Sequence, residues 1–556
     1  MGEIASGAVA VTKSKPAPAR KEEAPAGTLF WALTPQQAAI LAAIVIVTIA
    51  IYLPSMRNGW VFDDWQEFVD NKLIHNWSFV WNSFRYDSWW FLEPRQLPAS
   101  AYYRPLENTW FAANALLFGT HPAAWHLTKI ALHAVAVILC FRVAQLLTGE
   151  VVAGLIAAAI FGVMPAHTGG VVWASAIPEP LSTVFELGAM TFLIGRKPGW
   201  SRGLFIALIL YACATLTHES AILFPLIVFA YAFIFESDEN VEGAGTRRRI
   251  VKALLVCAPF VAVAIAYICA RLSALGANYM FGVPPSATGT LVLRGFVVLK
   301  AHHTPAEILM TMPVVLIAYL AILTLPQVAG PTHEVRWITH PAPIVFISAA
   351  ALMVLAAAAI VAAWRSPRRR IFLFCAAWSL FTIAPALNLD ALWWPVDDRY
   401  LYAPSFGWSL AVAVAVLQIA AAGATARKAV GVAMAALLAM YAISTMRTER
   451  YWYDDVAFFQ RCVEIAPRES DYRVRLAAAL NKAGNPEQAA AELEAGTALD
   501  PDDVHLHLKL AQQYKMMGRE VEFEQEFQKF NQLSQAKVER ERAAPAAGAS
   551  QPADAP

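Results

Sequence analysis

Long apolar runs alternate with short polar segments along most of the chain. A run of about 18 or more apolar residues is long enough to cross a bilayer as a helix. The candidate spans are 38–56, 126–147, 151–165, 178–195, 203–217, 219–235, 252–270, 288–301, 306–325, 343–364, 370–388, 403–422 and 428–446. The shortest of them are 151–165, 203–217 and 288–301. The pattern predicts an all-α fold, a polytopic membrane helical bundle with about 11–13 spans.

The pattern changes after residue 446, where the chain becomes charged, Ala-rich and helical in period. Three pairs of residues recur 34 positions apart: Pro467 and Pro501, Leu476 and Leu510, and Gly484 and Gly518. This is the period of tetratricopeptide repeats, which are helix–turn–helix units. We predict a tetratricopeptide-repeat domain over residues 447–540, with Leu510, Ala511 and Tyr514 in its core. Such repeats stack into a concave surface that binds peptides, and docking onto the membrane domain is the alternative role.

Composition supports the membrane assignment. The chain is 58% hydrophobic and 15% charged, which excludes a soluble multi-domain protein and makes the lipid bilayer a partner. The net charge of +1 gives no indication of nucleic-acid binding. Residues 1–35 and 541–556 are predicted to be disordered tails, the first of them cytoplasmic, because it lacks the apolar segment of a signal peptide. The transmembrane domain is predicted over residues 36–446, with a large external loop at 57–125.

Lys and Arg are concentrated in five short segments, and such clusters mark cytoplasmic loops. The clusters lie at 13–21, 196–202, 247–252, 365–370 and 427–428. Thirteen spans with a cytoplasmic N-terminus would put all five on one side. The opposite, extracytoplasmic side would carry the loop 57–125, the turns 165–167 and 217–219, the loops 271–287 and 389–402, and everything after residue 446. The span at 288–301 is critical, because its omission would invert the later half of the topology.

Two adjacent carboxylates, Asp63 and Asp64, directly follow the first span. Ionisable side chains so close to hydrocarbon are costly and commonly functional. The pair could act as a general base, as ligands of a divalent cation such as Mg²⁺ or Mn²⁺, or as both. The structural alternative is a helix start, where Asp is common. The sequence indicates no further cofactor.

Two arginines on the predicted external face could bind an anion. Arg104 follows Tyr103 in the aromatic-rich loop, and an ion pair with Glu107 or Asp63 that shapes the loop is its structural alternative. Arg399 lies shortly before Tyr402 at the start of a span, where the two preceding aspartates could neutralise it. Because a guanidinium fork matches phosphate oxygens, a lipid-linked phosphate is the functional partner that we consider for both arginines.

Four more polar residues lie in turns between apolar segments on the same face. Glu219 follows His218, Glu179 stands between two prolines, and His167 closes a Pro-Ala-His turn. A Glu at such a depth must be paired or face a wet cavity. We predict that these residues, together with Tyr103 and Tyr402, border a substrate cavity and contact the substrate. A structural turn is the alternative for Glu219, and packing is the alternative for His167.

Several short motifs are similar to those of one family when they are taken in order. They are Phe62-Asp63-Asp64, Tyr103-Arg104-Pro105-Leu106, Trp125-His126-Leu127, Phe161 to Thr168, His218-Glu219, and Asp398-Arg399-Tyr400-Leu401-Tyr402. In their order and spacing, which extend over most of residues 38–530, the chain resembles the transmembrane-and-tetratricopeptide O-mannosyltransferases and their bacterial relatives.

The resemblance implies a glycosyltransferase of the GT-C fold. It would transfer a mannose-type hexose from a polyprenyl-phosphate donor to a protein hydroxyl on the extracytoplasmic face. Carried over by position, Asp63 would be the general base, and Asp64 would assist by orientation or through a cation. Arg399 and Arg104 would hold the leaving lipid phosphate, and Glu219 would shape the cavity. The repeats would be placed to hold the protein or peptide acceptor.

The chain departs from the family's pattern in three places, one of which is Ala176-Ile177-Pro178-Glu179, where the usual Gly-Arg before the acid is missing. His218 stands where relatives usually have Lys, and Gly169-Gly170 stands where they often have Glu. Two other functions therefore stay open: a glycosyltransferase acting on a lipid or a cell-wall glycan, and a non-catalytic membrane-anchored tetratricopeptide scaffold. The Ala-rich composition favours the bacterial inner membrane, with the repeats on the extracytoplasmic side. The endoplasmic reticulum membrane is the alternative location.

Overall fold

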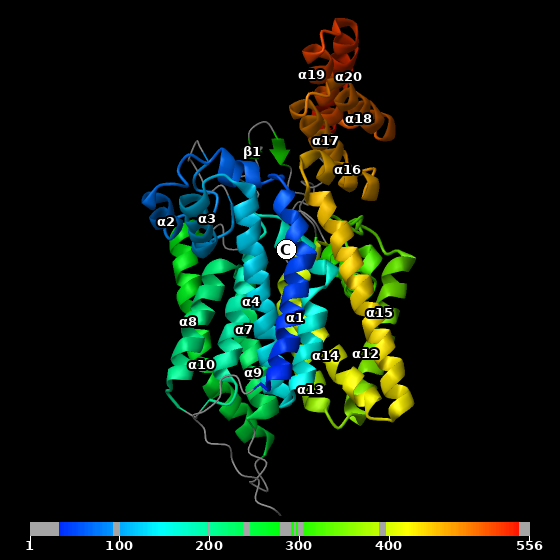
Figure 1. Cartoon of the computed structure of the whole chain (residues 1–556). Coiled ribbons are helices and arrows are strands. Elements are labelled where there is room, and N and C mark those ends of the chain that lie inside the picture. Colours follow the sequence, from blue (N-terminus) through cyan, green and yellow to red (C-terminus); the bar gives the residue numbers. More distant parts are fainter. Residues whose placement is uncertain are drawn as a thin grey trace, which may run out of the picture.

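Helices dominate the computed structural model, which describes residues 33–92, 100–196, 199–236, 245–277, 291–293, 296–298, 304–387 and 396–543. Long helices form a bundle, and a smaller domain of short helices lies on one end of it (Figure 1). The predicted fold class, an all-α membrane bundle with a C-terminal tetratricopeptide-repeat domain, is confirmed. Most of the two predicted tails lies outside the described residues.

The bundle helices in the described residues are α1 (Pro35–Tyr52), α4 (Pro122–Thr148), α5 (Val151–Gly162), α7 (Pro178–Leu193), α8 (Arg202–Thr217), α9 (Phe224–Phe235), α10 (Thr246–Leu275), α11 (Pro305–Thr324), α12 (Pro343–Arg365), α13 (Arg369–Ile383), α14 (Pro404–Ala420) and α15 (Ala424–Thr448). Seven helices of the described part are long and apolar enough to cross a membrane. There are up to eight if α5 and the bent segment Pro165–Val172 count as one span. The chain is therefore a multi-pass membrane protein.

Close packing between α13 and α14 depends on a glycine. A Cβ added to Gly407 of α14 would lie 2.6 Å from the carbonyl oxygen of Cys375 on α13, and it would also meet the Ser379 hydroxyl. Helices in a membrane associate through such close packing. Lipid tails are as apolar as the helix side chains, so no hydrophobic effect drives the helices together.

We expect Gly407→Ala to lower the unfolding temperature of the detergent-purified protein, because overpacking a close contact costs about 1–3 kcal/mol. The matched control is Gly431→Ala on α15, where an added Cβ meets nothing within 4 Å. The control should be neutral or slightly stabilising, because Ala favours a helix over Gly by about 1 kcal/mol. Thermal unfolding followed by intrinsic fluorescence measures both. Equal unfolding temperatures for the two variants would contradict the close approach.

The turns of the bundle lie at two opposite ends. Arg368, between α12 and α13, forms an ion pair with Glu150 at the start of α5, with nitrogen–oxygen distances of 2.7 and 3.0 Å. The basic cluster at 365–370 therefore lies at the same end as the turn at 149–150. At the opposite end, α15 continues through η10 (Glu449–Trp452) into the repeats. We call this opposite end the repeat end.

The membrane span predicted at 288–301 is contradicted by the structure. Within it, β1 (Leu291–Leu293) and β2 (Phe296–Val298) pair as antiparallel strands. The segment is short and carries Arg294, so it does not supply the roughly 20 apolar residues that a spanning helix needs.

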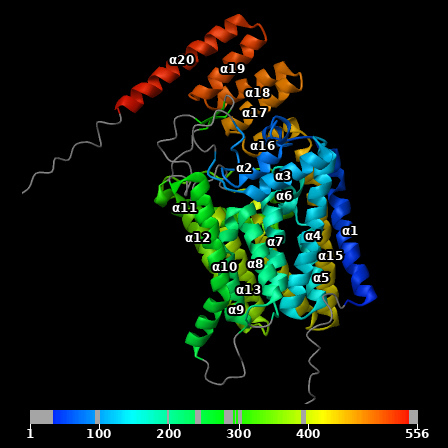
Figure 2. The same cartoon turned by 90° about the vertical axis from the view of Figure 1, so that its left-hand side faces the viewer.

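The basic cluster at 365–370 lies at the end predicted for it, although 288–301 is not a spanning helix. The reason is that both halves of α11 contact the repeat end. The N–H of Ile338 donates to Thr311 Oγ1 at 3.0 Å, and the Tyr441 hydroxyl donates to the carbonyl of Leu323. The connection from α11 to α12 also lies at this end, because the Thr332 hydroxyl is 2.6 Å from that of Tyr472 in the repeats. Figure 2 shows α11 at the level where the bundle meets the repeats. The loss of the span predicted at 288–301 therefore does not change the end assigned to residues 365–370.

The long loop between α1 and α4 folds as a cap over the repeat end. Its elements are η1 (Leu53–Arg57), η2 (Trp65–Val69), α2 (Trp77–Ser83) and α3 (Pro105–Phe118). Phe68 and Phe111 pack against Trp125 of α4, with ring centroids 4.3 and 6.3 Å apart. Aromatic side chains of this loop therefore build a core of their own.

The repeat domain consists of α16 (Asp455–Ile465), α17 (Ser470–Lys482), α18 (Pro486–Leu499), α19 (Val504–Met516) and α20 (Glu520–Ala543). Gly484 and Gly518 have φ angles of +80° and +73° and follow α17 and α19. Glycine is the residue that most easily adopts this left-handed conformation after a helix. Leu510, Ala511 and Tyr514 are buried, as the repeat pattern predicts.

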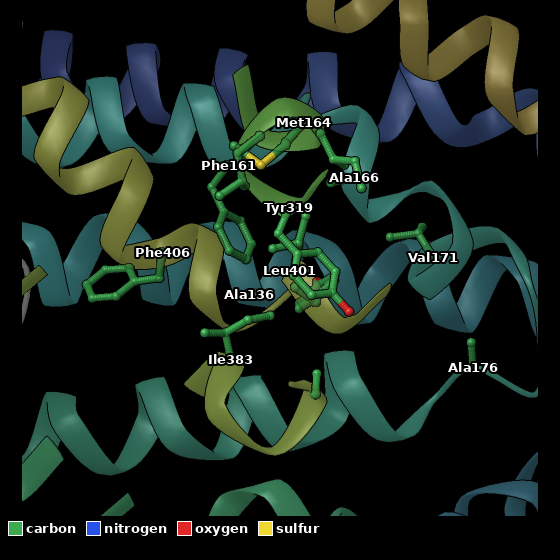
Figure 3. Packing of buried hydrophobic residues seen from close by; sticks show 14 of the residues in the cluster. Ala136, Phe161, Met164, Ala166, Val171, Ala176, Tyr319, Ile383, Leu401 and Phe406 are labelled. Atoms are coloured by element: carbon green, nitrogen blue, oxygen red, sulfur yellow. The ribbon is translucent and has the colours of Figure 1, made fainter. Parts of the chain in front are cut away.

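A continuous apolar core fills the bundle beside the repeat end. Phe161 of α5, Tyr319 of α11 and Leu401 of η9 (Asp398–Leu401) pack between the helices (Figure 3). All three are buried. Because segments distant in sequence share this core, the polar turns attached to them are held in fixed positions relative to one another.

Candidate active site

A strained turn follows α1 and presents the two predicted aspartates. Phe62 has a φ angle of +56° and is the only non-glycine residue with positive φ in the described part of the chain. Such a backbone costs about 1–3 kcal/mol and persists only when its surroundings hold it. The Phe62 N–H donates to the Asp455 carboxylate at 2.8 Å, and its ring packs near those of Trp173 and Phe458. Both the bundle and the repeats therefore hold this turn.

Asp64 anchors the turn to the bundle. Its side chain is buried, and one carboxylate oxygen accepts from the N–H of Ser175 at 2.9 Å and from its hydroxyl at 2.5 Å. The other oxygen accepts from the N–H of Val61 at 3.0 Å. Burial raises the pKa of Asp64 to about 7, although these donors oppose the rise. A carboxylate held by three donors fixes geometry, so the structure gives Asp64 a positioning role.

Asp63 has a different environment from its neighbour. It is half-buried, and its carboxylate has no hydrogen-bond partner among the described residues. Burial raises the pKa of Asp63 to about 6, and the positive charges of Arg475 and Arg399 oppose that rise. A general base is most effective when its pKa lies near the working pH. Asp63 therefore has the properties of a base, whereas the oxygens of Asp64 are already engaged.

Polar residues from four separate segments meet in one charged network. Arg104, just before α3, binds Glu219 through Nε, which lies 3.0 and 2.9 Å from the two carboxylate oxygens. Arg399 of η9 has its Nε 3.0 Å from Asp397 and 3.5 Å from Glu179 at the start of α7. We call this group, together with His218, the arginine–carboxylate network. Arg104 also has its Nη1 3.8 Å from Glu107, the partner considered as its structural alternative.

His218 links the two halves of the network. Its Nε2 lies 3.9 Å from Glu179, and its Nδ1 lies 3.8 Å from Glu219. Burial lowers the pKa of His218 to about 4, and the nearby Arg104 guanidinium contributes to the lowering. The imidazole is therefore neutral at pH 7. It does not supply the positive charge that a Lys would supply at this position.

Three predicted substrate-binding residues lie in packed surroundings instead. His167 is buried, with its Nε2 2.7 Å from the Ser405 hydroxyl, and its ring packs against Tyr402 with a centroid separation of 4.4 Å. The Tyr402 hydroxyl lies 2.6 Å from Nδ1 of His133. Tyr103 is also buried, and its hydroxyl donates to a backbone carbonyl at 3.0 Å. Short apolar-flanked motifs give no sign of which way such rings turn, and these three turn into the core.

Several residues at the site carry no signal in the sequence. Glu67 lies one helical turn after Asp63, and burial raises its pKa well above the usual value. Ser175, Asp455 and Arg475 stand in ordinary loop or helix contexts and reach the site only through the fold. The 34-residue spacing predicts the helix that bears Arg475, but not that this helix lies against the Asp63 turn.

The described residues do not form a cation site around the two aspartates. No group of three or more His, Cys, Asp or Glu side chains gathers there, or elsewhere in the described ranges, in an arrangement that could hold a metal ion. The donors of Ser175 and Val61 also occupy the oxygens of Asp64. A cation bound by the two aspartates therefore stays a prediction, and the proposed reaction has no step that depends on it.

Comparison with known proteins gives matches to both domains. The family model described as tetratricopeptide repeat matches residues 457–512. The chain is 24% identical to protein O-mannosyl-transferase TMTC3 of Mus musculus over 507 residues, which cover 86% of this chain and 53% of the relative. It is 25% identical to protein O-mannosyl-transferase Tmtc3 of Drosophila melanogaster, over 87% of this chain and 58% of the relative.

A human relative, protein O-mannosyl-transferase TMTC3 of Homo sapiens, is 23% identical over 88% of this chain and 54% of its own length. The chain thus spans about half the length of the curated relatives that it matches. Over most of its own length it is similar to the transmembrane-and-tetratricopeptide protein O-mannosyl-transferases, as the ordered motifs predict.

Proposed function

We propose that this protein is a membrane glycosyltransferase of the GT-C type. It transfers a mannose-type hexose from a polyprenyl-phosphate donor to a hydroxyl of a protein, on the extracytoplasmic face. The observation that carries the proposal is the state of Asp63, a half-buried carboxylate on a strained turn with no hydrogen-bond partner among the described residues. Its neighbour Arg399 belongs to the arginine–carboxylate network.

In the proposed reaction, Asp63 takes the proton of the acceptor hydroxyl. The hydroxyl oxygen forms a bond to the anomeric carbon, while the bond from that carbon to the donor phosphate oxygen breaks. The phosphate leaves with the electron pair as polyprenyl phosphate, and the anomeric configuration inverts. Positive charge at the leaving oxygens lowers the barrier, because it opposes the charge that develops there.

Arg104 and Arg399 are the residues that would bind this phosphate. Their Nε atoms contact Glu219 and Asp397, and Nη1 of Arg104 also lies 3.8 Å from Glu107. In the proposed complex the Nη nitrogens would donate to phosphate oxygens. The neutral His218 lies 3.9 Å from Glu179 and 3.8 Å from Glu219 and adds no charge. The two guanidinium groups therefore supply the positive charge that His218 does not.

The proposed orientation follows from the basic loops. The cluster at 365–370 lies at the end opposite the repeats, and basic clusters mark the cytoplasmic side. The repeat end, with Asp63 and the network, then faces away from the cytoplasm. We propose the bacterial inner membrane as its location, and the repeats as the surface that receives the acceptor polypeptide.

A transfer assay with two donors tests the proposal. Purified protein in detergent is incubated with a Ser/Thr-rich peptide and either polyprenyl-phosphate mannose or a nucleotide-linked mannose. We expect peptide mass to rise by one hexose with the lipid-linked donor only. Mass spectrometry of the peptide and of released polyprenyl phosphate measures both products. Transfer from the nucleotide donor, or hexose on lipid acceptors but never on peptide, would contradict the proposal.

A further inference from the structure

The repeat domain contacts the Asp63 turn on both of its sides. Before the turn, the N–H of Gly59 donates to the carbonyl of Tyr453 at 2.8 Å. After the turn, the Lys482 ammonium of α17 lies over the ring of Trp65. The strained residue between these contacts, Phe62, donates its own N–H to a residue of α16. The repeats therefore do more than extend from the bundle, because they support the backbone that presents Asp63.

Arg475 of α17 is a charged repeat-domain residue that contacts the Asp63 turn. Its guanidinium carbon lies 4.9 Å from the centre of the Phe62 ring, and its Nε lies 2.5 Å from Asp471 on the same helix. The side chain is mostly buried in this contact. Its charge acts on Asp63 from the repeat side, as that of Arg399 does from the bundle side.

We propose that the repeat domain is an integral part of the active site, in which Arg475 is a positioning residue that keeps Asp63 ionised and oriented. The inference rests on the proposed function and deepens it. It follows that the repeats act on the chemical step for every acceptor, including one too small to touch their concave surface. A domain that only captured polypeptide would affect long acceptors alone.

The charges around Asp63 explain why Arg475 has this effect. Asp64 and Glu67 face it from its own segment, and both are carboxylates. Arg399 faces it from η9, and Arg475 faces it from α17. Removing Arg475 leaves the effect of burial opposed by one cation, Arg399. The proton then stays on Asp63 to higher pH, and a protonated carboxyl cannot act as the base.

The test compares Arg475→Gln and Asp471→Asn in the full chain, with a single blocked threonine and a long Ser/Thr-rich peptide as acceptors. We expect Arg475→Gln to lower kcat about fivefold at pH 6 with both acceptors, because the acidic limb of the pH profile moves upward by about one pH unit. Asp471→Asn removes the partner that partly neutralises Arg475, so its acidic limb should move to lower pH. Arg475→Lys, which keeps the charge, should restore most of the activity.

The matched control is Arg461→Gln on α16, which removes the same charge from the repeats. Arg461 pairs with Glu464 at 2.9 Å and lies over Tyr451 instead of Phe62, so its pH profile should equal that of the wild type. The inference would be overturned if Arg475→Gln changed only KM for the long peptide. It would also be overturned if the acidic limb of the pH profile shifted in neither test variant. If Arg475→Gln does not fold, the direction of the Asp471→Asn shift decides. Absence of transfer by the wild type would instead overturn the proposed function.

Discussion

Replacing Asp63 by Asn is expected to reduce kcat of hexose transfer by about 10²–10⁴-fold, the contribution that a positioned general base typically makes. The amide has nearly the same shape and cannot accept the hydroxyl proton. The turn itself should remain, because its hydrogen bonds come from Asp64 and Asp455 and not from the Asp63 side chain. Initial rates with polyprenyl-phosphate mannose and a peptide acceptor measure the loss, together with the unfolding temperature.

Asp70→Asn provides the control for this substitution, because Asp70 is exposed and lies in the same segment. The control variant should transfer hexose at the wild-type rate. Wild-type rates for Asp63→Asn would exclude Asp63 as the base. Absence of transfer by the wild type itself would favour the non-catalytic scaffold.

Replacing Arg399 by Gln is expected to lower kcat by about 10²–10³-fold, the typical loss when one group that stabilises developing negative charge is removed. The variant should also bind the product polyprenyl phosphate more weakly, which raises its inhibition constant. Arg399 is the partner of Asp397 and Glu179, so its loss also leaves two buried carboxylates. Breaking a buried pair in this way costs about 3–5 kcal/mol of stability.

A double variant separates the two effects. Arg399→Gln with Asp397→Asn removes both charges of the closer pair, and it should recover much of the unfolding temperature without recovering transfer. Arg336→Gln, an exposed arginine paired with Glu334 at 2.9 Å, is the control and should change neither quantity. Recovery of transfer together with stability in the double variant would mean that Arg399 acts only on the fold.

The helical organisation could be predicted well because its signals are local. A spanning helix needs a long apolar run, and a tetratricopeptide repeat needs glycine and apolar residues at a 34-residue period, so Gly484 and Gly518 identify the turns after α17 and α19 directly. The error at 288–301 has a physical cause. Apolar strands and short apolar helices have similar composition, so hydropathy alone did not distinguish β1 and β2 from a marginal span.

The candidate site could be predicted in part. Arg104, Glu179, His218, Glu219 and Arg399 come together because each follows or precedes an apolar helix that ends at the repeat end. Counting spans places such residues on one side. It does not tell which side chains turn toward one another, and His167, Tyr103 and Tyr402 turn into the core instead.

The sequence by itself determined the membrane class, the repeat domain, the ordered motifs and the presence of two adjacent aspartates after the first span. The tertiary structure gives those two aspartates different surroundings. Hydrogen bonds from Ser175, 111 residues away, engage Asp64, while the positive φ of Phe62 presents Asp63 between cations from two domains. Neighbours in sequence share a local pattern, but burial and donors depend on what the fold brings against each side chain, and only the folded chain contains that information.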